Sequence, residues 1–181
     1  SVAMANDGRF VVVWEDNARG GNNHDVRYAL YSAAGVQVAS GIVNTTVTGV
    51  RENARVAMNR VSGEFVVVFA GGISQTAVDV YIRAYTAAGA AVAPEQKVNT
   101  GGNLQTDVPS VAIASNGNII VAWDTDAVGD ANWEVMFQRF TFPTTVVGTN
   151  TQASLVGSDV TNVDVACDDA GNFVLAWVDG L

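Results

Sequence analysis

VAMANDGRFVVVW, residues 2–14, returns three times along the chain with the same framework of apolar residues, a turn glycine and an aromatic ring. The later copies occupy residues 56–69, 111–123 and 165–177. Their turn glycines, Gly8, Gly63, Gly117 and Gly171, are 55, 54 and 54 residues apart. Such regular self-similarity is typical of solenoids, propellers and other repeat architectures. The repeat therefore predicts how the chain is built, while its residues point to no particular chemistry.

Each copy of this stretch is predicted to form a β-hairpin. In the first copy, the apolar residues Val2 to Met4 precede a turn that closes on Gly8, and glycine supplies the positive φ of a tight hairpin. The second strand, residues 10–14, is apolar at every position, so both of its faces must be covered. Residues 65–69, 119–123 and 173–177 repeat this strand.

Two further strands complete each predicted unit. Residues 25–31 form a third strand, with Val26, Tyr28 and Leu30 on one face, and residues 79–85 and 134–140 match it. An acidic residue opens each of these strands and is expected to accept hydrogen bonds from the backbone or from arginine. A glycine turn then leads to a fourth strand that ends near Val43-Asn44, or Val98-Asn99 in the second unit. Each unit is thus predicted to be a four-stranded antiparallel meander, and no segment has helical periodicity.

A sheet whose second strand is apolar on both faces is expected to lie between copies of itself, as in a β-propeller. A β-helix has shorter coils and parallel strands, whereas glycine hairpins require antiparallel pairing. A β-sandwich domain needs about 100 residues, which exceeds the period. The predicted fold class is therefore all-β: a β-propeller of four-stranded antiparallel blades, about 3.5 of them in this chain. The predicted blades are residues 1–54, 55–109 and 110–163, with the first two strands of a fourth in 164–181.

The pattern V-A-x … D/N-G-x-F-V-V-x-W … D-V-x-x-x-x-Y … G … V-N resembles a blade repeat of large bacterial secreted and surface-anchored proteins. The resemblance covers the whole chain, and its motifs are architectural, so it implies a fold rather than an activity. The third unit departs from the pattern. Phe142-Pro143-Thr144 replaces its glycine turn, and the terminal Val-Asn pair is missing.

Charge and composition exclude several classes of function. The chain carries 18 acidic and 9 basic residues, a formal net charge of −9, so nucleic acid, whose phosphates require clustered cations, is not an expected partner. No apolar run approaches the roughly 18 residues of a membrane span. The single cysteine, Cys167, excludes an internal disulfide framework and a thiolate metal cage. Few lysines, many Asn, Thr and Gly residues, and net acidity favour a secreted or cell-surface protein.

The loop after the second strand of the third unit contains the candidate metal ligands. Asp124, Asp126 and Asp130 follow Trp123 at offsets 1, 3 and 7, and Gly129 allows the chain to bend back so that oxygen ligands converge on Ca²⁺. The pattern is partial, because an oxygen side chain near Val128 and a bidentate carboxylate are missing. Calcium is thus the one predicted cofactor, and the alternative is a solvated acidic turn.

The same loop contains the candidate ligand-binding residues Asn132 and Trp133. An indole beside amides and carboxylates is suited to stack on a sugar ring, and it is equally suited to cap the edge of the neighbouring blade. Glycoside hydrolysis on a propeller would use paired carboxylates near the axis. The acidic residues next to the first and second strands are candidates, although no spacing pairs them: Glu15, Glu52, Asp107, Asp124, Asp159 and Asp164.

Three units and a hairpin do not close a ring, and the first strand at Val2 cannot supply the third and fourth strands of the fourth unit. We therefore expect the ring to be completed by the remainder of a longer chain or by self-association. The sequence predicts a non-catalytic extracellular module for recognition, adhesion or assembly, with a protein or glycan partner. The alternatives are a β-propeller glycoside hydrolase or polysaccharide lyase, and a carbohydrate-binding lectin.

Overall fold

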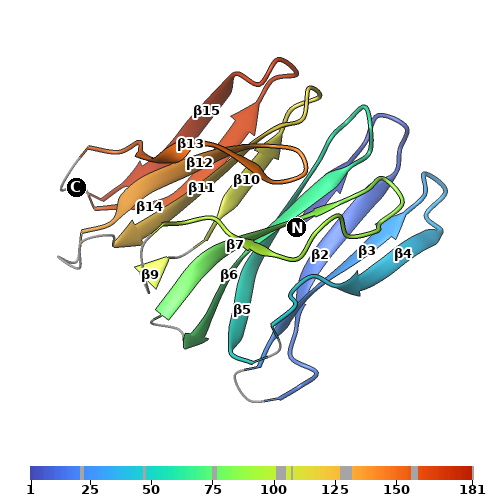
Figure 1. Cartoon of the computed structure of the whole chain (residues 1–181), viewed down its shortest axis with the longest axis horizontal. Coiled ribbons are helices and arrows are strands. Elements are labelled where there is room, and N and C mark those ends of the chain that lie inside the picture. The colour runs from blue at the N-terminus through green and yellow to red at the C-terminus, as the bar shows by residue number, and fades with distance from the viewer. Residues whose placement is uncertain are drawn as a thin grey trace.

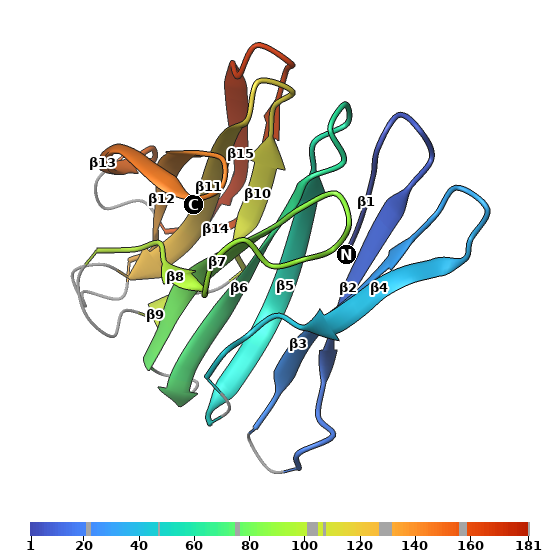
Figure 2. The same ribbon diagram turned by 45° about the vertical axis from the view of Figure 1, so that its right-hand side comes forward.

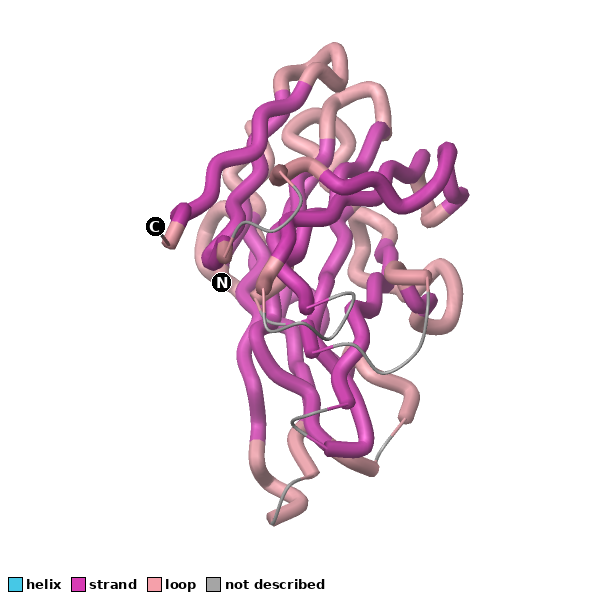
Figure 3. The backbone as a smooth tube through the Cα atoms, turned by 90° about the vertical axis from the view of Figure 1, so that its left-hand side faces the viewer, coloured by secondary structure: helices cyan, strands magenta, loops and turns pink. Residues whose placement is uncertain are grey.

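The structure, a computed structural model, describes residues 1–20, 23–46, 48–74, 77–100, 105–106, 108–126, 132–155 and 159–180. Every regular element in these ranges is a β-strand, as the strands and loops of Figure 3 show. The same ranges contain no helix with the length and apolarity needed to cross a membrane.

The strands form four consecutive sheets, all paired antiparallel. The first sheet contains β1 (Val2–Met4), β2 (Phe10–Asp16), β3 (Asp25–Tyr31) and β4 (Gln37–Ile42) in that order. The second contains β5 (Val50–Met58), β6 (Phe65–Ser74), β7 (Ala77–Tyr85) and β8 (Gln96–Lys97). The third contains β10 (Ser110–Ile113), β11 (Asn118–Asp126), β12 (Glu134–Thr141) and β13 (Thr145–Gln152), with β9 (Gln105–Thr106) also pairing β11. The fourth contains β14 (Val160–Cys167) and β15 (Phe173–Asp179). The predicted four-stranded meanders are confirmed.

The first strand of a sheet begins earlier than the Val-Ala motif that marks it in the sequence. β5 starts at Val50, inside the predicted range 1–54, and β14 starts at Val160, inside 110–163. Both strands contain a register shift, and within it Asn53 and Asn162 have φ of 57°. Such a bulge breaks the two-residue alternation of side chains. The sequence pattern therefore does not reveal the part of each strand that precedes the bulge.

The sheets stack face to face in chain order, and Figures 1 and 2 show them fanned from blue to red. The first strands β1, β5, β10 and β14 contact one another in sequence, so they converge while the outer strands spread. Three apolar cores lie between successive sheets. Because burial of one large apolar side chain contributes about 1.5 to 3 kcal/mol, packing between sheets dominates stability.

The second strands are covered on both faces only in the middle of the stack. Phe69 and Trp123 expose 0% and 1% of their surface, as predicted for this position. Trp14 and Trp177 expose 42% and 37%, so the predicted covering of both strand faces is not met at these two positions of the described chain. Trp14 faces away from the stack, and Trp177 lies on a sheet of only two strands.

The third strand of the first sheet follows the predicted pattern, with Val26, Tyr28 and Leu30 buried against the second sheet. The acidic residue that opens this strand has the predicted structural role, because Oδ2 of Asp25 accepts a hydrogen bond of 2.8 Å from Nε of Arg19. Oδ1 of Asp25 accepts a hydrogen bond of 2.9 Å from Asn44, whose own Oδ1 accepts the Val26 N–H. Asp79 and Asn99 repeat this contact, which explains the recurring Val-Asn pair. In the third sheet Ser154 takes the place of the asparagine and accepts the Val135 N–H at 3.0 Å.

Candidate functional site

The turns that join the first and second strands lie in a row along one edge of the stack, as Figure 2 shows. The residue two positions beyond the end of each first strand occupies the same place in all four repeats. These four residues, which we call the turn row, are Asn6, Arg60, Ser115 and Asp169. The turn glycines are constant, and all four have positive φ, between 77° and 89°. The repeat therefore conserves the frame and varies the functional group.

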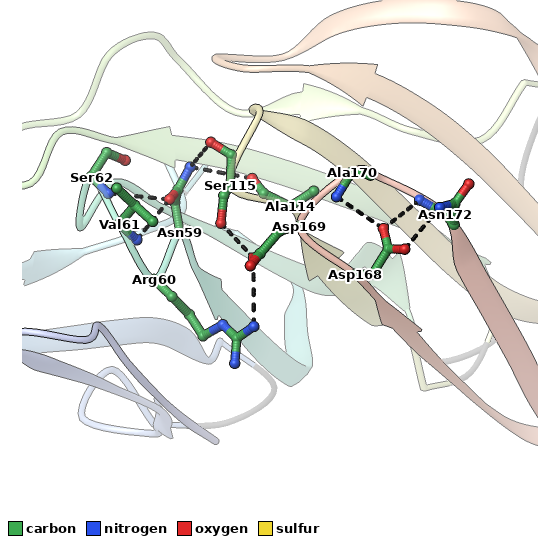
Figure 4. A network of polar contacts seen from close by, with 10 residues as sticks. All are labelled: Asn59, Arg60, Val61, Ser62, Ala114, Ser115, Asp168, Asp169, Ala170 and Asn172. Carbon is green, nitrogen blue, oxygen red and sulfur yellow. Dashed lines mark hydrogen bonds and ion pairs between the residues drawn. The ribbon is translucent and has the colours of Figure 1, made fainter.

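Direct contacts connect the turn row from sheet to sheet. The backbone N–H of Asn6 donates to the carbonyl of Arg60 at 2.8 Å. Figure 4 shows Asp169 receiving two side chains from preceding sheets. Its Oδ1 accepts the Ser115 hydroxyl at 2.5 Å and contacts Nη2 of Arg60 at 3.5 Å. Both Arg60 and Asp169 are well exposed, so the row presents a guanidinium and a carboxylate to solvent.

Buried polar groups hold this row in place. Asn59 is buried and donates to the carbonyls of Ala114 and Ser115, both at 3.2 Å. Its Oδ1 accepts the backbone N–H groups of Val61 and Ser62, so one side chain shapes its own turn and attaches it to the next. Figure 4 shows these contacts beside the exposed row. Asn59 thereby links the second turn of the row to the third.

Asp168 stabilises the last turn. Its Oδ1 accepts the N–H groups of Ala170 and Asn172 at 3.0 and 2.9 Å, and its Oδ2 accepts the Asn172 side-chain amide at 2.8 Å. The hydrogen bond from Asn172 holds the pKa of Asp168 below its ordinary value. The Ser115 hydroxyl and the Arg60 charge do the same for the pKa of Asp169. Both carboxyls are therefore ionised at neutral pH and act as hydrogen-bond acceptors.

The row presents donors and acceptors at fixed spacing, which suits a ligand rich in hydroxyls or a polar protein surface. Sequence reasoning concentrated on the loops between second and third strands and missed these turns. A signal was present, because one repeat position holds Asn, Arg, Ser and Asp beside an invariant glycine. Only the stacking of the sheets brings those four positions together.

The predicted metal ligands are only partly described. Asp124 lies on β11 with 1% of its surface exposed, and its Oδ2 accepts the Asn162 N–H at 2.9 Å. Asp126 is half-buried at the end of the same strand, and Asp130 lies outside the described residues. In the described ranges, no three His, Cys, Asp or Glu side chains are grouped as metal ligands. The calcium site stays a prediction.

Asn132 and Trp133 lie at the other end of β11 from the turn row, and both are half-buried. The carbonyl of Trp133 accepts the Val160 N–H at 3.1 Å, which attaches this segment to the fourth sheet. The backbone contact accords with the capping interpretation. Contact of the indole with a sugar stays a prediction.

Three of the carboxylates considered for hydrolysis form contacts that hold neighbouring sheets together. Oε1 of Glu15 accepts the Asn53 N–H at 2.7 Å, and Asp124 does the same for Asn162. Oδ1 of Asp164 accepts the Ser110 hydroxyl at 2.6 Å. Asp107 lies outside the described residues. These contacts join the second strand of one sheet, or its first strand, to the first strand of the next.

A groove of about 430 Å³ lies between the third and fourth sheets, away from the turn row. Phe137, Arg139 and Thr149 line one wall, and Phe173 on β15 forms the other, with the two phenyl rings 5.4 Å apart. In the preceding sheets, third and fourth strands occupy the corresponding position. The groove thus follows from the two-stranded fourth sheet.

No protein-family model matches the chain, and no curated protein matches it. Solved structures do match. An α-L-arabinofuranosidase from Fusarium graminearum is 11% identical, with 99% of this chain and 56% of that chain covered and a TM-score of 0.67. An α-L-arabinanase from Penicillium chrysogenum, complexed with arabinobiose, is 10% identical (93% and 53% covered, TM-score 0.61).

An endo-arabinase from Bacteroides thetaiotaomicron is also similar, at 12% identity, with 94% and 66% covered and a TM-score of 0.58. The chain spans between 53% and 66% of these three structures. At sequence identities this low, the similarity is evidence for the fold alone. Together with the four stacked antiparallel sheets, they show that the chain forms part of a β-propeller, about 3.5 blades of it.

Proposed function

We propose that the chain is part of a secreted or cell-surface β-propeller that recognises carbohydrate through the turn row and does not hydrolyse it. The observation that carries the proposal is the turn row itself. Four equivalent positions present Asn, Arg, Ser and Asp on a constant and internally braced frame. A position that serves only the fold would repeat its residue, as the turn glycines do.

The chemistry of the row fits sugar hydroxyls. Each hydroxyl both donates and accepts, so a sugar is bound by carboxylates, amides and guanidinium groups acting together. Among the described contacts Asp169 uses Oδ1, which leaves Oδ2 to accept a ligand hydroxyl. Arg60 and Asn6, in the two earlier sheets of the row, supply donors. Charge-assisted hydrogen bonds of this kind are about twice as strong as neutral ones.

The similar structures support carbohydrate as the ligand class. Their names describe enzymes of arabinan and arabinofuranoside chemistry, and the Penicillium chrysogenum structure contains arabinobiose. Arabinan fragments are therefore the first ligands to test. The same similarity favours a second candidate function, a glycoside hydrolase.

The site residues argue against hydrolysis. Glycoside hydrolysis requires one carboxylic acid with a raised pKa as proton donor and a second carboxylate as nucleophile or base. The pKa values of Asp168 and Asp169 are lowered by their hydrogen-bond donors. Glu15, Asp124 and Asp164 each hold a neighbouring strand. These contacts are our reason for proposing binding without turnover, whereas the similarity of fold favours the hydrolase.

Isothermal titration with arabino-oligosaccharides, beside a panel of other glycans, tests the proposal. Asp169→Asn should weaken binding about tenfold, because a charge-assisted hydrogen bond is lost. Asp179→Asn, an exposed residue at the opposite end of β15, serves as the matched control and should bind normally. Turnover of arabinan or a chromogenic arabinofuranoside would replace the proposal with the hydrolase. Equal binding by both variants would remove the turn row as the site.

A further inference from the structure

The backbone closes all four turns of the turn row in the same way. The residue directly after each first strand donates its backbone N–H to the carbonyl of the residue that follows the turn glycine, at 2.8 or 2.9 Å. The four donors are Ala5, Asn59, Ala114 and Asp168. In the first and third sheets this residue is a buried alanine, so the hairpin itself does not require the side-chain amide of Asn59.

The amide of Asn59 instead connects two turns. The side chain exposes only 2% of its surface, and a buried amide is retained where its polar atoms are hydrogen-bonded. Its Oδ1 accepts two backbone N–H groups of its own turn, and its Nδ2 donates to the carbonyls of Ala114 and Ser115, as Figure 4 shows. Asn59 thus fixes the backbone of Ser115, the residue whose hydroxyl donates to Asp169.

Asn116 makes the same kind of connection between the third and fourth turns. Its Oδ1 accepts the backbone N–H of Asn118 in its own turn at 2.9 Å, and its Nδ2 donates to the carbonyl of Ala170 in the next turn at 2.8 Å. The equivalent residues in the other turns are Asp7, Val61 and Ala170. Two asparagines at different repeat positions therefore connect three consecutive turns.

Each contact lies next to a residue of the turn row. Arg60 follows Asn59, Ser115 precedes Asn116, and Asp169 precedes Ala170. The Arg60–Asp169 pair, 3.5 Å apart with both side chains more than 60% exposed, contributes little by itself to holding the turns together, because exposed ion pairs are weak.

We propose that Asn59 and Asn116 are positioning residues of the turn row, which hold the Ser115 hydroxyl and the Arg60 guanidinium against the carboxylate of Asp169. Neither asparagine needs to touch a ligand in this role. The consequence for sugar binding rests on the proposed function, whereas the arrangement of the three row residues does not.

The acidity of Asp169 reports this arrangement without any ligand. The Ser115 hydroxyl lowers the pKa of Asp169 most, and the Arg60 charge lowers it further, while desolvation and the neighbouring charge of Asp168 act in the opposite direction. Loss of a positioning residue lets the hydroxyl and the guanidinium move away from the carboxylate. The pKa of Asp169 should then rise toward its ordinary value.

A carbon-13 NMR titration of the Asp169 carboxyl measures this rise. We expect a raised pKa in Asn59→Ala and in Asn116→Ala, in the same direction as in Ser115→Ala, which removes the hydroxyl outright. Asn116 is exposed, so its variant should stay folded even where Asn59→Ala loses stability. Asn17→Ala, at an exposed asparagine just beyond β2 and at the other end of the strands, is the matched control and should leave the pKa unchanged.

Titration of the same variants with arabino-oligosaccharides tests the role in recognition. Loss of a pre-organised side chain should weaken binding about two- to tenfold in Asn59→Ala and Asn116→Ala, with Asn17→Ala unaffected. An Asp169 pKa that is unchanged in both variants overturns the inference. Variants that bind sugar as tightly as the unmodified chain overturn the role in recognition. A raised pKa in a chain that binds no sugar removes the proposed function and upholds the positioning role.

Discussion

Oδ2 of Asp124 on β11 accepts a hydrogen bond of 2.9 Å from the backbone N–H of Asn162 on β14. Glu15 and Asn53 make the same contact between the first and second sheets at 2.7 Å. Both asparagines have left-handed backbone with φ of 57°, within the bulges of β14 and β5. We call this contact the carboxylate latch. It joins the second strand of one sheet to the first strand of the next.

The interface between the second and third sheets has no carboxylate at the latch position. Ala70 occupies the position of Glu15 and Asp124 in the second sheet and offers no acceptor. In the third sheet two short strands, β9 and β10, each pair with β11. The latch thus accompanies a continuous, bulged first strand in the following sheet. The sequence made its carboxylates candidates for catalysis, and the structure shows them bonded to the backbone of the following sheet.

Removal of the latch carboxylate should destabilise the fold. Asp124→Ala leaves the Asn162 N–H without its acceptor, and loss of such a bond costs about 1 to 3 kcal/mol in the free energy of unfolding. Asp124→Asn keeps a carbonyl oxygen and should cost less. Urea denaturation measures both, with Asp126→Ala as the control on the same strand. If alanine and asparagine have equal effects, the hydrogen bond is not what Asp124 contributes.

Stability should fall in acid through Asp25. Burial acts to raise its pKa, but hydrogen bonds from Asn44 and Arg19 outweigh it and lower the pKa overall. A carboxyl with a depressed folded-state pKa stabilises the fold above its unfolded value, about 3.9 for aspartate, and this stability is lost as pH falls through the folded pKa.

The check is the urea midpoint as a function of pH. Asp25→Asn should lower stability at neutral pH and flatten the acid limb of the profile relative to the unmodified chain. Asp179→Asn, at an exposed position of β15, should retain the full pH dependence. If the fall in urea midpoint at acid pH is unchanged in Asp25→Asn, groups other than Asp25 cause the pH dependence.

Calcium binding at Asp124, Asp126 and Asp130 remains open to a direct test. Bound calcium stabilises the folded state by mass action, and 1 kcal/mol raises the melting temperature of a chain this size by about 2 to 4 °C. Millimolar Ca²⁺ should therefore raise the melting temperature relative to chelator, and Asp130→Asn should remove the rise. An unchanged melting temperature would reduce these residues to a solvated acidic turn.

Substitution of Trp133 distinguishes the two interpretations of its loop, capping of the neighbouring blade and stacking on a sugar. The backbone contact with Val160 and the half-buried side chain favour the cap. Trp133→Ala should then lower the free energy of unfolding by about 1 to 3 kcal/mol through lost burial, with glycan affinity unchanged. Trp133→Phe should restore most of the stability. Lost glycan affinity at normal stability would instead make Trp133 part of a binding site.

Local pattern predicted the repeated parts of the fold. The hairpin glycines, the buried Val26, Tyr28 and Leu30 face, and the structural aspartate at Asp25 all follow from spacing within one unit. Contacts between units were not predictable in this way. The left-handed Asn53 donates its backbone N–H to Glu15 of another sheet, and the exposure of Trp14 follows from its place at the end of the stack.

The candidate site illustrates the same limit. Arg60, Ser115 and Asp169 are more than fifty residues apart from one to the next, and only the stacking of turns brings them into contact. Their variation within a constant frame was visible in the sequence. Their proximity was not, since it follows from the order of the sheets.

Chemical-shift mapping of backbone amides during titration with an arabino-oligosaccharide tests the carbohydrate proposal most directly. We expect the largest chemical-shift changes at the amides of Arg60, Ser115 and Asp169. The amides of Asp126 and Trp133, at the far end of the strands, should not shift. Changes confined to the far end, or no change at saturating sugar, would contradict carbohydrate recognition by the turn row.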